Sequence, residues 1–273
     1  MVLTVSELSI YPVKSLGGIA LAEMVLERRG PRDDRRFVLA DESGAFITQR
    51  EYPTLCRIAV VAAGEGWMLS APGMPDLSIA PAAADDAQRT QVTVWKDRVE
   101  ACDMGESAAA WFSAYLQRPA RLYTMPEDSL RPVDANYLPA AARAAQSGDI
   151  VGFADGFPIL LIGAASLAEF NRSLPAPIGS ERFRPNIVVA GAEPYAEDAW
   201  RTLRIGALEF DIVKPCSRCV IPSIDPLTAQ KQPVVSKALA RLRRRGDAVY
   251  FGQNVVHRGC GSIRVGDVVE VLA

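Results

Sequence analysis

VKPCSRCVIPSIDP, residues 213–226, is the stretch on which the assignment of this chain depends, because it holds two cysteines at C-x-x-C spacing. Such a pair can close a disulfide, hold half of a zinc site, carry out thiol redox chemistry or present one thiolate to another metal. The sequence around Cys216 and Cys219 has to decide between these four uses.

Two of these uses fit the sequence poorly. A structural zinc site needs four ligands, and this chain offers one C-x-x-C pair and a single histidine, His257. A thioredoxin-like site places its first cysteine at the start of a helix, where the helix dipole lowers the pKa of the thiol. Here Pro222 and Pro226 follow Cys219 and disfavour a regular helix.

Two interpretations of the pair remain open on the residues alone. Cys216 and Cys219 can be ordinary half-buried thiols at a strand end, because free cysteine packs well as a small hydrophobe. Alternatively, Lys214, Arg218 and Lys231 flank the pair and favour thiolate over thiol. A thiolate among basic groups suits a soft metal carried by an anionic cofactor.

The overall composition excludes several classes of protein. With 273 residues, 49% of them apolar, the chain can bury the core of two small domains or one long one. A net charge of −2 gives no general basic excess for nucleic acid, and no run of 18 apolar residues predicts a membrane span. The N-terminus has no signal-like pattern and the five cysteines form no even disulfide framework, so we expect a reducing, cytoplasmic setting.

Short apolar runs cut by Gly, Pro, Asn or Asp dominate the first hundred residues. This pattern predicts strands within residues 5–13, 35–44, 66–73, 76–81 and 90–103. Many short strands with regular punctuation are typical of a barrel or sandwich-like β domain. We place the boundary of this domain near residue 118, which gives domains 1–118 and 119–273.

Helical periodicity marks three stretches: 106–116, 166–174 and 236–245. In the second, Ser166 and Glu169 have the spacing of a capping box. In the third, Ser236 is the expected N-cap, and Gly246 lies just past the expected end.

The remaining residues predict connections and further strands. The Ala- and Pro-rich stretch 126–149 is expected to be a long connection or a lid. Buried or alternating strands are expected in 186–191 and 203–213. Residues 262–272 predict a hairpin-like strand pair around Gly266 and Asp267.

An ordered set of motifs resembles the MOSC superfamily. The motifs are YPVKS (11–15), RFRPNIVVAG (182–191), YAEDAW (195–200), KPCSRCVIPSIDP (214–226), GQ (252–253) and VGD (265–267). The set is similar to MOSC proteins that carry an N-terminal β-barrel domain, which include the mitochondrial amidoxime reducing component and bacterial reductases of N-hydroxylated bases. The resemblance implies a mixed, β-rich α+β fold: an N-terminal β-barrel-like domain and a C-terminal MOSC β-barrel domain with peripheral helices.

The same resemblance implies that the chain binds the molybdenum cofactor (Mo-molybdopterin) between its two domains. Cys219 would be the metal ligand, and Cys216 its non-ligating partner. The pterin and its phosphate would be held by Lys14, Ser15, Arg36, Arg184, Asn186 and Ser217. Where relatives read TTVDP this chain reads PSIDP, so Pro222 and Ser223 alter the wall next to the metal.

The implied activity is the two-electron reduction of N-hydroxylated compounds such as amidoximes, hydroxylamines and N-hydroxy bases. Asp225 is a candidate proton relay, with a turn residue as the alternative. No G-x-G-x-x-G motif and no four-cysteine set is present, so electrons should come from a separate ferredoxin, flavodoxin or cytochrome with its reductase. The basic run 241–245 is either its docking face or a solvated helix face.

A rival function follows from the same superfamily. MOSC domains also occur in molybdenum cofactor sulfurases, so the chain could carry cofactor or sulfur without turning over a small substrate. That likeness also brings an expectation of pyridoxal phosphate binding. Reduction of benzamidoxime with an artificial electron donor separates the enzyme from the carrier.

Overall fold

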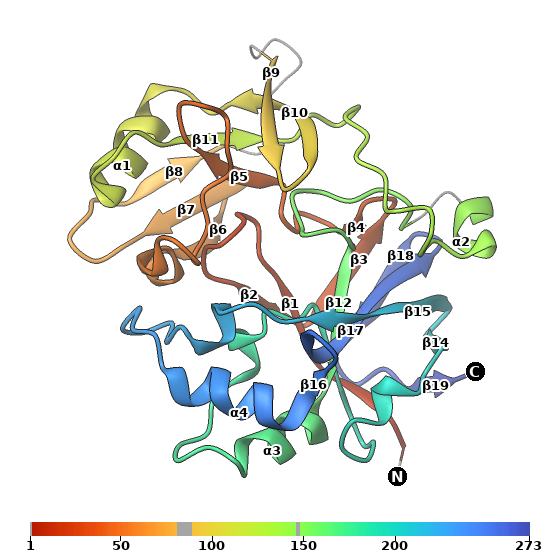
Figure 1. Ribbon diagram of the computed structural model, residues 1–273. Helices are drawn as coiled ribbons and strands as arrows, with labels where there is room; N and C mark the ends of the chain where they lie inside the picture. The colour runs from red at the N-terminus through yellow and green to blue at the C-terminus, as the bar shows by residue number, and fades with distance from the viewer. Residues whose placement is uncertain (1, 81–88, 146–147) are drawn as a thin grey trace.

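The structure is a computed structural model that describes residues 2–80, 89–145 and 148–273. Two β-rich lobes lie one above the other, and the chain crosses between them more than once (Figure 1). The expected β-rich α+β fold is confirmed, because strands dominate both lobes and the helices lie at their periphery.

Two small sheets and one helix build the upper lobe. The first sheet has the order β5 (Phe37–Ala40), β11 (Arg121–Thr124), β10 (Asp97–Asp103) and β9 (Arg89–Val94). The second consists of β6 (Ala59–Ala63), β7 (Gly66–Ser70) and β8 (Leu77–Ile79). Helix α1 (Glu106–Leu116) has the expected bounds and buries Trp111, Phe112 and Leu116 against the same core as Leu55 and Leu122.

A nine-stranded sheet forms the lower lobe. Its main path is β19 (Val269–Val271), β14 (Thr202–Ile205), β15 (Leu208–Ser217), β17 (Ala248–Arg258), β12 (Ile159–Gly163), β13 (Ile187–Ala190), β1 (Thr4–Ile10) and β2 (Ile19–Leu21). The short β16 (Arg244–Arg245) pairs with β17 off this path. A separate three-stranded sheet of β18 (Gly261–Arg264), β3 (Glu23–Glu27) and β4 (Gly30–Pro31) lies beside it.

Hydrogen bonds between the two ends of the chain close the large sheet. Thr4 forms a bridge with Val268, and the amide of Val269 donates to the carbonyl of Leu3 at 2.9 Å. These contacts join β1 to β19, so the sheet curls round as a barrel. Alternating side chains of the strands fill its interior, among them Leu8, Phe210 and Val255.

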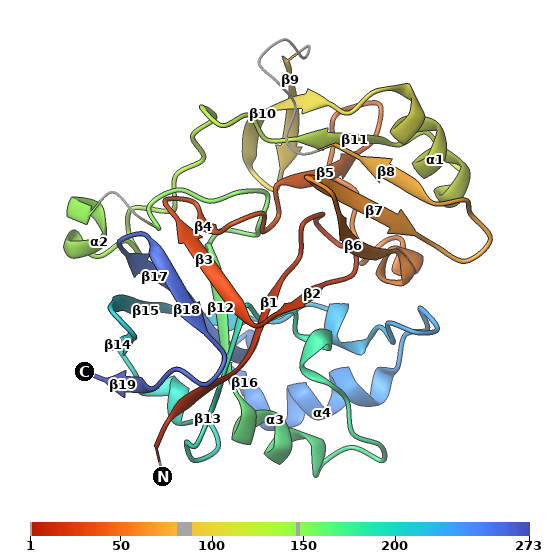
Figure 2. The ribbon, with the colours of Figure 1, turned by 180° about the vertical axis from the view of Figure 1, so that it is seen from behind.

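The helices and short 3₁₀ turns lie outside the sheets. Helices α3 (Ala164–Asn171) and α4 (Pro233–Arg243) lie side by side below the large sheet (Figures 1 and 2). The remaining elements are α2 (Ala140–Ala145), η1 (Pro53–Arg57), η2 (Ser180–Arg182), η3 (Ala196–Asp198) and η4 (Ile221–Ser223). No helix in the described part of the chain is long and apolar enough to cross a membrane.

The capping box expected at Ser166 is wrong. Helix α3 begins at Ala164, so Ser166 lies inside its first turn, and its hydroxyl donates to the Glu197 carboxylate at 2.7 Å. The same hydroxyl accepts the backbone amide of Tyr195 at 2.7 Å. A buried carboxylate that needs a donor has therefore taken the hydroxyl from its expected capping role.

The start and end expected for the third helix are also wrong. Helix α4 begins at Pro233, which is favoured in the first turn because it needs no amide partner there, so Ser236 is not the N-cap. The helix ends at Arg243, and Arg244 and Arg245 form β16 instead. The basic run 241–245 is thus part helix and part strand.

The expected C-terminal hairpin is wrong as well, although its turn exists. Gly266 has a positive φ of 94°, which suits a tight turn. The strands on either side separate, however: β18 pairs with β3, and β19 pairs with β14. Because β19 takes part in closing the barrel, it does not pair with β18, its neighbour in sequence.

The stretch 126–149 runs as the connection between β11 and β12. It contains α2, and its residues Val133, Leu138 and Ala142 pack with Val151 and Val256; residues 146–147 lie outside the described part. The domain boundary near residue 118 stays a prediction. In space, β11 belongs to the upper lobe and β1 to the lower one, so each lobe takes strands from both sides of that residue.

Candidate functional site

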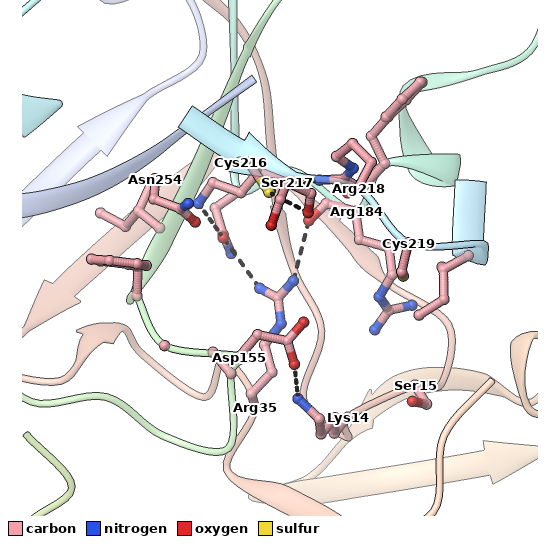
Figure 3. A pocket seen from close by; sticks show the side chains of 18 of the residues that line it. Lys14, Ser15, Arg35, Asp155, Arg184, Cys216, Ser217, Arg218, Cys219 and Asn254 are labelled. Atoms are coloured by element: carbon pink, nitrogen blue, oxygen red, sulfur yellow. Dashed lines mark hydrogen bonds and ion pairs between the residues drawn. The ribbon is translucent and has the colours of Figure 1, made fainter. Parts of the chain in front are cut away.

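A cavity of about 530 Å³ is lined by residues of both lobes. Its walls come mainly from the loop after β1, the segment before β5, the β9–β10 turn, residues 154–160, the segment before β13 and the end of β15. Figure 3 shows Lys14 and Ser15 on one side, the segment Cys216–Cys219 opposite, and the guanidinium of Arg35 between them.

Most of the predicted site residues line this one cavity, although they are spread over 200 positions of the sequence. Those that do are Lys14, Ser15, Arg184, Asn186, Ser217 and Cys219. Their roles toward a cofactor stay predictions, but their convergence provides a place where those roles can be performed. Arg36 and Asp225 are not part of the lining.

The structure places Arg35, rather than the predicted Arg36, at the cavity. The Arg36 guanidinium points away and donates to the Met125 carbonyl at 3.1 Å and to Glu127 at 2.6 Å. Arg35 donates to the amide oxygen of Asn186 and to the carbonyl of Arg184, both at 3.1 Å. Arg35 lies in a turn and has a left-handed backbone with φ of 48°, whereas Arg36 lies just after this turn, so the two side chains leave the chain in different directions.

Asp225 has the contacts of a turn residue. Its carboxylate accepts the amides of Leu227 at 2.9 Å and Thr228 at 3.1 Å, and it lies 3.5 Å from Arg182. Burial opposes its ionisation, but these amides and the guanidinium together hold the pKa of Asp225 below its usual range. A carboxylate held ionised outside the cavity is poorly placed to relay protons within it.

The two thiols of the C-x-x-C segment have different surroundings. Cys216 is half-buried, and its sulfur accepts a hydrogen bond from Arg218 Nη1 at 3.1 Å. Arg218 is itself fixed by donating to the carbonyl of Phe183 at 2.7 Å. Cys219 is exposed and lines the cavity. Cys216 lines the same cavity, but Cys219 is the more exposed of the two thiols and has no contact with Arg218 comparable to that of Cys216.

The strand register separates the histidine from the cysteine pair. His257 lies opposite Phe210 in the β15–β17 pairing, six residues along the strand from Cys216, or roughly 20 Å at the usual rise. Within residues 2–80, 89–145 and 148–273 no three His, Cys, Asp or Glu side chains gather as metal ligands. The geometry therefore disfavours a zinc site that combines Cys216 and Cys219 with His257.

Positive charge dominates the cavity. Its lining holds the cations Lys14, Arg35, Arg50, Arg184, Lys214 and Arg218, and the single carboxylate Asp155. Burial and the neighbouring Arg35 lower the pKa of Arg184 to about 10. Burial also lowers the pKa of Lys14, although its ion pair with Asp155 at 2.6 Å opposes the shift. Cations that are this costly to bury together favour an anionic ligand.

Tyr11 holds two of these cations in place. The guanidinium carbons of Arg35 and Arg184 lie 4.4 and 4.2 Å from the centroid of its buried ring. Its hydroxyl donates a hydrogen bond to the carbonyl of Pro185 at 3.2 Å. Both groups are neutral, so this hydrogen bond adds no charge to the cavity. Burial raises the pKa of Tyr11 to about 12, so the ring stays neutral between the two arginines. The two cations are thereby oriented before any ligand arrives.

Backbone conformations that L-residues rarely adopt gather at the cavity. Among the described residues eight non-glycine residues have positive φ, and four of them line the cavity: Ser15, Arg35, Trp95 and Arg184. Left-handed backbone is unfavourable for such residues and persists only where the surroundings impose it. Such concentration is typical of functional sites.

Arg131 fixes the loop that carries Asp155. This buried guanidinium donates to the carbonyls of Gly152 at 2.9 Å and Ala154, and pairs with Asp97 at 2.8 Å. It therefore joins the loop before β12 to the start of β10. Sequence reasoning missed Arg131 because its partners are mostly backbone carbonyls, which carry no sequence signal.

The donor set of the cavity fits a large anionic group that carries a thiolate-binding metal. Cys219 offers an accessible thiol, the arginines and lysines offer charge-assisted hydrogen bonds, and Asn186 offers a buried amide. The other lining residues are mainly neutral or apolar. The chemistry is thus that of an anion site with one soft ligand.

Comparisons with known proteins match both halves of the chain. Residues 2–119 match the MOSC N-terminal beta barrel domain, and residues 149–270 match the MOSC domain. The human mitochondrial amidoxime-reducing component 1 is 32% identical over 283 residues, covering 98% of this chain and 83% of that protein. The rat mitochondrial amidoxime reducing component 2 is 31% identical over 97% of this chain and 82% of that protein.

A zebrafish protein of another class also matches. The molybdenum cofactor sulfurase of Danio rerio is 27% identical over 277 residues, which cover 93% of this chain but 32% of the sulfurase. The two mammalian proteins are therefore matched over most of their length, and the sulfurase over about a third.

Proposed function

Because the chain belongs to the MOSC family of the amidoxime-reducing components, we propose that it is a molybdenum-cofactor oxidoreductase that reduces N-hydroxylated compounds. An amidoxime would take up two electrons and two protons and yield the amidine and water. The observation that carries this proposal is one cavity in which an accessible thiol, Cys219, lies among six cations, four of which form no ion pair with a described residue.

Each side chain of the cavity has a task in this reaction. Cys219 would bind the metal, and Cys216, engaged by Arg218, would not. Lys14, Arg184 and the arginine revealed by the structure, Arg35, would bind the pterin phosphate, while Asn186, Ser15 and Ser217 would orient the ring. The bound cofactor supplies the two-electron redox chemistry.

The experiment with the largest discriminating power measures metal, pterin and turnover together. We expect the purified protein to contain molybdenum and pterin in equal amounts and to reduce benzamidoxime with a dye as electron donor. Cys219→Ser should lose the activity, because molybdenum prefers thiolate to hydroxyl, and Cys216→Ser should keep most of it. An active Cys219→Ser with an inactive Cys216→Ser would reverse the assignment of the ligand.

The carrier function is the weaker alternative. It rests on the likeness to the sulfurase, of which this chain spans 32%. The expectation of pyridoxal phosphate has the same single source, so we leave it out of the proposal. A protein that holds molybdenum and pterin but does not reduce benzamidoxime with any donor would favour the carrier.

The electrons would come from a separate acidic protein: a ferredoxin, a flavodoxin or a cytochrome with its reductase. Neither a dinucleotide fingerprint nor a four-cysteine cluster motif occurs in the sequence. We therefore expect no turnover with NADH or NADPH alone, and turnover with NADH and no added protein would contradict this part. We place the reaction in the cytoplasm, which fractionation of cells expressing the full-length protein tests.

A further inference from the structure

The turn between β9 and β10 carries a residue that suits it poorly. Val94 pairs with Asp97, so the turn consists of two residues, Trp95 and Lys96. Two-residue turns favour Gly, Asn or Asp at their first position, because that position needs a positive φ. Here the position is occupied by Trp95, with φ of 59°. The backbone alone would select a much smaller residue.

The exposure of the Trp95 side chain to solvent is also unfavourable, because the hydrophobic effect favours burial of a large ring. Trp95 is 47% exposed, and its ring lines the cavity instead of the core. A tryptophan contributes most to folding when its large ring is buried. Neither backbone nor burial therefore accounts for this residue, and strain of this kind at a cavity points to a role toward a ligand.

The indole is held by three contacts, two of them with residues that also line the cavity. Its Nε1–H donates to Asp155 at 3.0 Å, and the Arg50 guanidinium carbon lies 4.1 Å from the ring centroid. The Phe46 ring is tilted against it at 5.3 Å. Asp155 in turn accepts a hydrogen bond from Lys14, so the orientation of the indole is tied to the wall of the cavity.

We propose that Trp95 is a specificity-determining residue, whose exposed ring stacks on the planar, conjugated part of the substrate. This inference rests on the proposed function and narrows its substrate class. Aromatic amidoximes and N-hydroxylated heterocyclic bases would be favoured over N-hydroxylated compounds built on saturated rings, because only a flat π-system can match the indole face.

The test compares two amidoximes that differ in one ring. Benzamidoxime is planar and conjugated, whereas cyclohexanecarboxamidoxime has the same head group on a saturated ring. Binding of both is measured by calorimetry on the holoenzyme without an electron donor, and kcat/KM for both with a dye donor. The wild type should prefer benzamidoxime by roughly tenfold in both measurements, as expected for one aromatic stack.

Two substitutions and one control separate the ring from the turn. Trp95→Leu, which keeps an apolar side chain, should abolish the preference, and Trp95→Phe, which keeps a flat ring, should retain most of it. Gln117→Leu is the control, because Gln117 also has a left-handed backbone, with φ of 54°, but is not part of the cavity lining. It should leave the preference unchanged.

The outcomes distinguish this inference from the function on which it rests. An unchanged preference in Trp95→Leu overturns it, as does a loss of bound pterin in that variant, which would make the cofactor the stacking partner. If the wild type reduces neither amidoxime, the proposed function fails. The preference for benzamidoxime in the binding measurement then still decides whether the Trp95 ring stacks on a planar ligand.

Discussion

Two groups of arginines in this molecule have opposite surroundings. Arg243 and Arg245 both contact the carboxylate of Asp198, at 2.6 and 2.5 Å, and Gln253 donates to the same carboxylate at 2.7 Å. Arg184 and Arg218, at the cavity, form no ion pair with any described carboxylate. Their partners are backbone carbonyls, two aromatic rings and a thiol.

The contrast between the two groups indicates which cations belong to a ligand site. The dense run at 241–245 looks functional in the sequence, yet Arg243 is buried and anchors α4 to the turn that carries Asp198. The cavity cations are scattered along the sequence and meet only in the fold. Arg184 and Arg218 lack an acidic partner and so favour an anion most strongly, whereas Lys14 and Arg35 at the same cavity are already paired with Asp155 and Asp34.

The largest effect is expected when one unpaired cation of the cavity is removed. Arg184→Ala should lower the retention of bound pterin more than tenfold, because a charge-assisted hydrogen bond contributes about 1.5–3 kcal/mol. Pterin content after desalting measures the effect, and Arg184→Lys, which keeps the charge, is the control and should lose less. Equal pterin content in Arg184→Ala and wild type would remove Arg184 from the anion site.

Removing one of the paired cations should lower the stability of the protein and leave pterin retention unchanged. Arg243→Ala should lower the free energy of unfolding by about 2 kcal/mol, because Asp198 loses one of its two guanidinium partners. Pterin retention, measured below the unfolding transition, should not change. Chemical denaturation of both variants provides the numbers, and loss of pterin in folded Arg243→Ala would show that the two groups are not independent.

A smaller effect is expected for the exposed arginines of the same run. Arg241 and Arg244 are exposed, unlike Arg243, and remain a candidate docking face for an acidic donor protein. Replacing both with Ala should slow the donor-driven reaction about threefold at low salt and spare the dye-driven one. If both reactions run at wild-type rate, the donor docks elsewhere.

The smallest effect concerns pH and Lys14. Because burial lowers the pKa of Lys14 below 10.5, the folded protein loses this charge at a lower pH than the unfolded chain does. As pH rises from the lowered pKa towards 10.5, the cost of burying the charge disappears, so the stability of the cofactor-free protein should rise slightly. Retention of the anionic cofactor should fall over the same interval.

Lys14→Arg should shift the loss of retention to higher pH, because arginine keeps its charge there. Desalting at graded pH followed by pterin analysis measures retention, and denaturation of the cofactor-free protein measures stability. The ion pair with Asp155 opposes the lowering of the Lys14 pKa, so both changes should be small. Retention that rises with pH would contradict the assignment of Lys14.

The sequence predicts the local elements well where periodicity and punctuation agree. Helix α1 and the strands β1, β5, β7, β8, β9 and β10 appear where they were expected, whereas β2, β3, β4 and β6 were not predicted. The failures come from distant partners: Glu197 takes the hydroxyl of Ser166, and β3 and β14 separate the strands beside Gly266. Neither partner is visible within a short window of sequence.

The candidate site is predictable as a set of motifs but not as a geometry. The choice between Arg35 and Arg36 depends on which side chain a turn with left-handed residues at Asp33 and Arg35 directs inward. Trp95 left a clue in the sequence: a large residue occupies a two-residue turn between alternating strands. Recognising it requires the exact register of β9 and β10, which the structure supplies.

The closure of the large sheet has a consequence for the biosynthesis of the protein. Strand β1 emerges first from the ribosome, yet it pairs with β13 and, through Thr4, with Val268 at the other end of the chain. At about 5–20 residues per second, the first strand waits roughly 10–50 s for its last partner. The upper lobe, whose sheets lie within residues 37–124, can form during that interval. The lobe that contains β1 is therefore completed after the upper lobe.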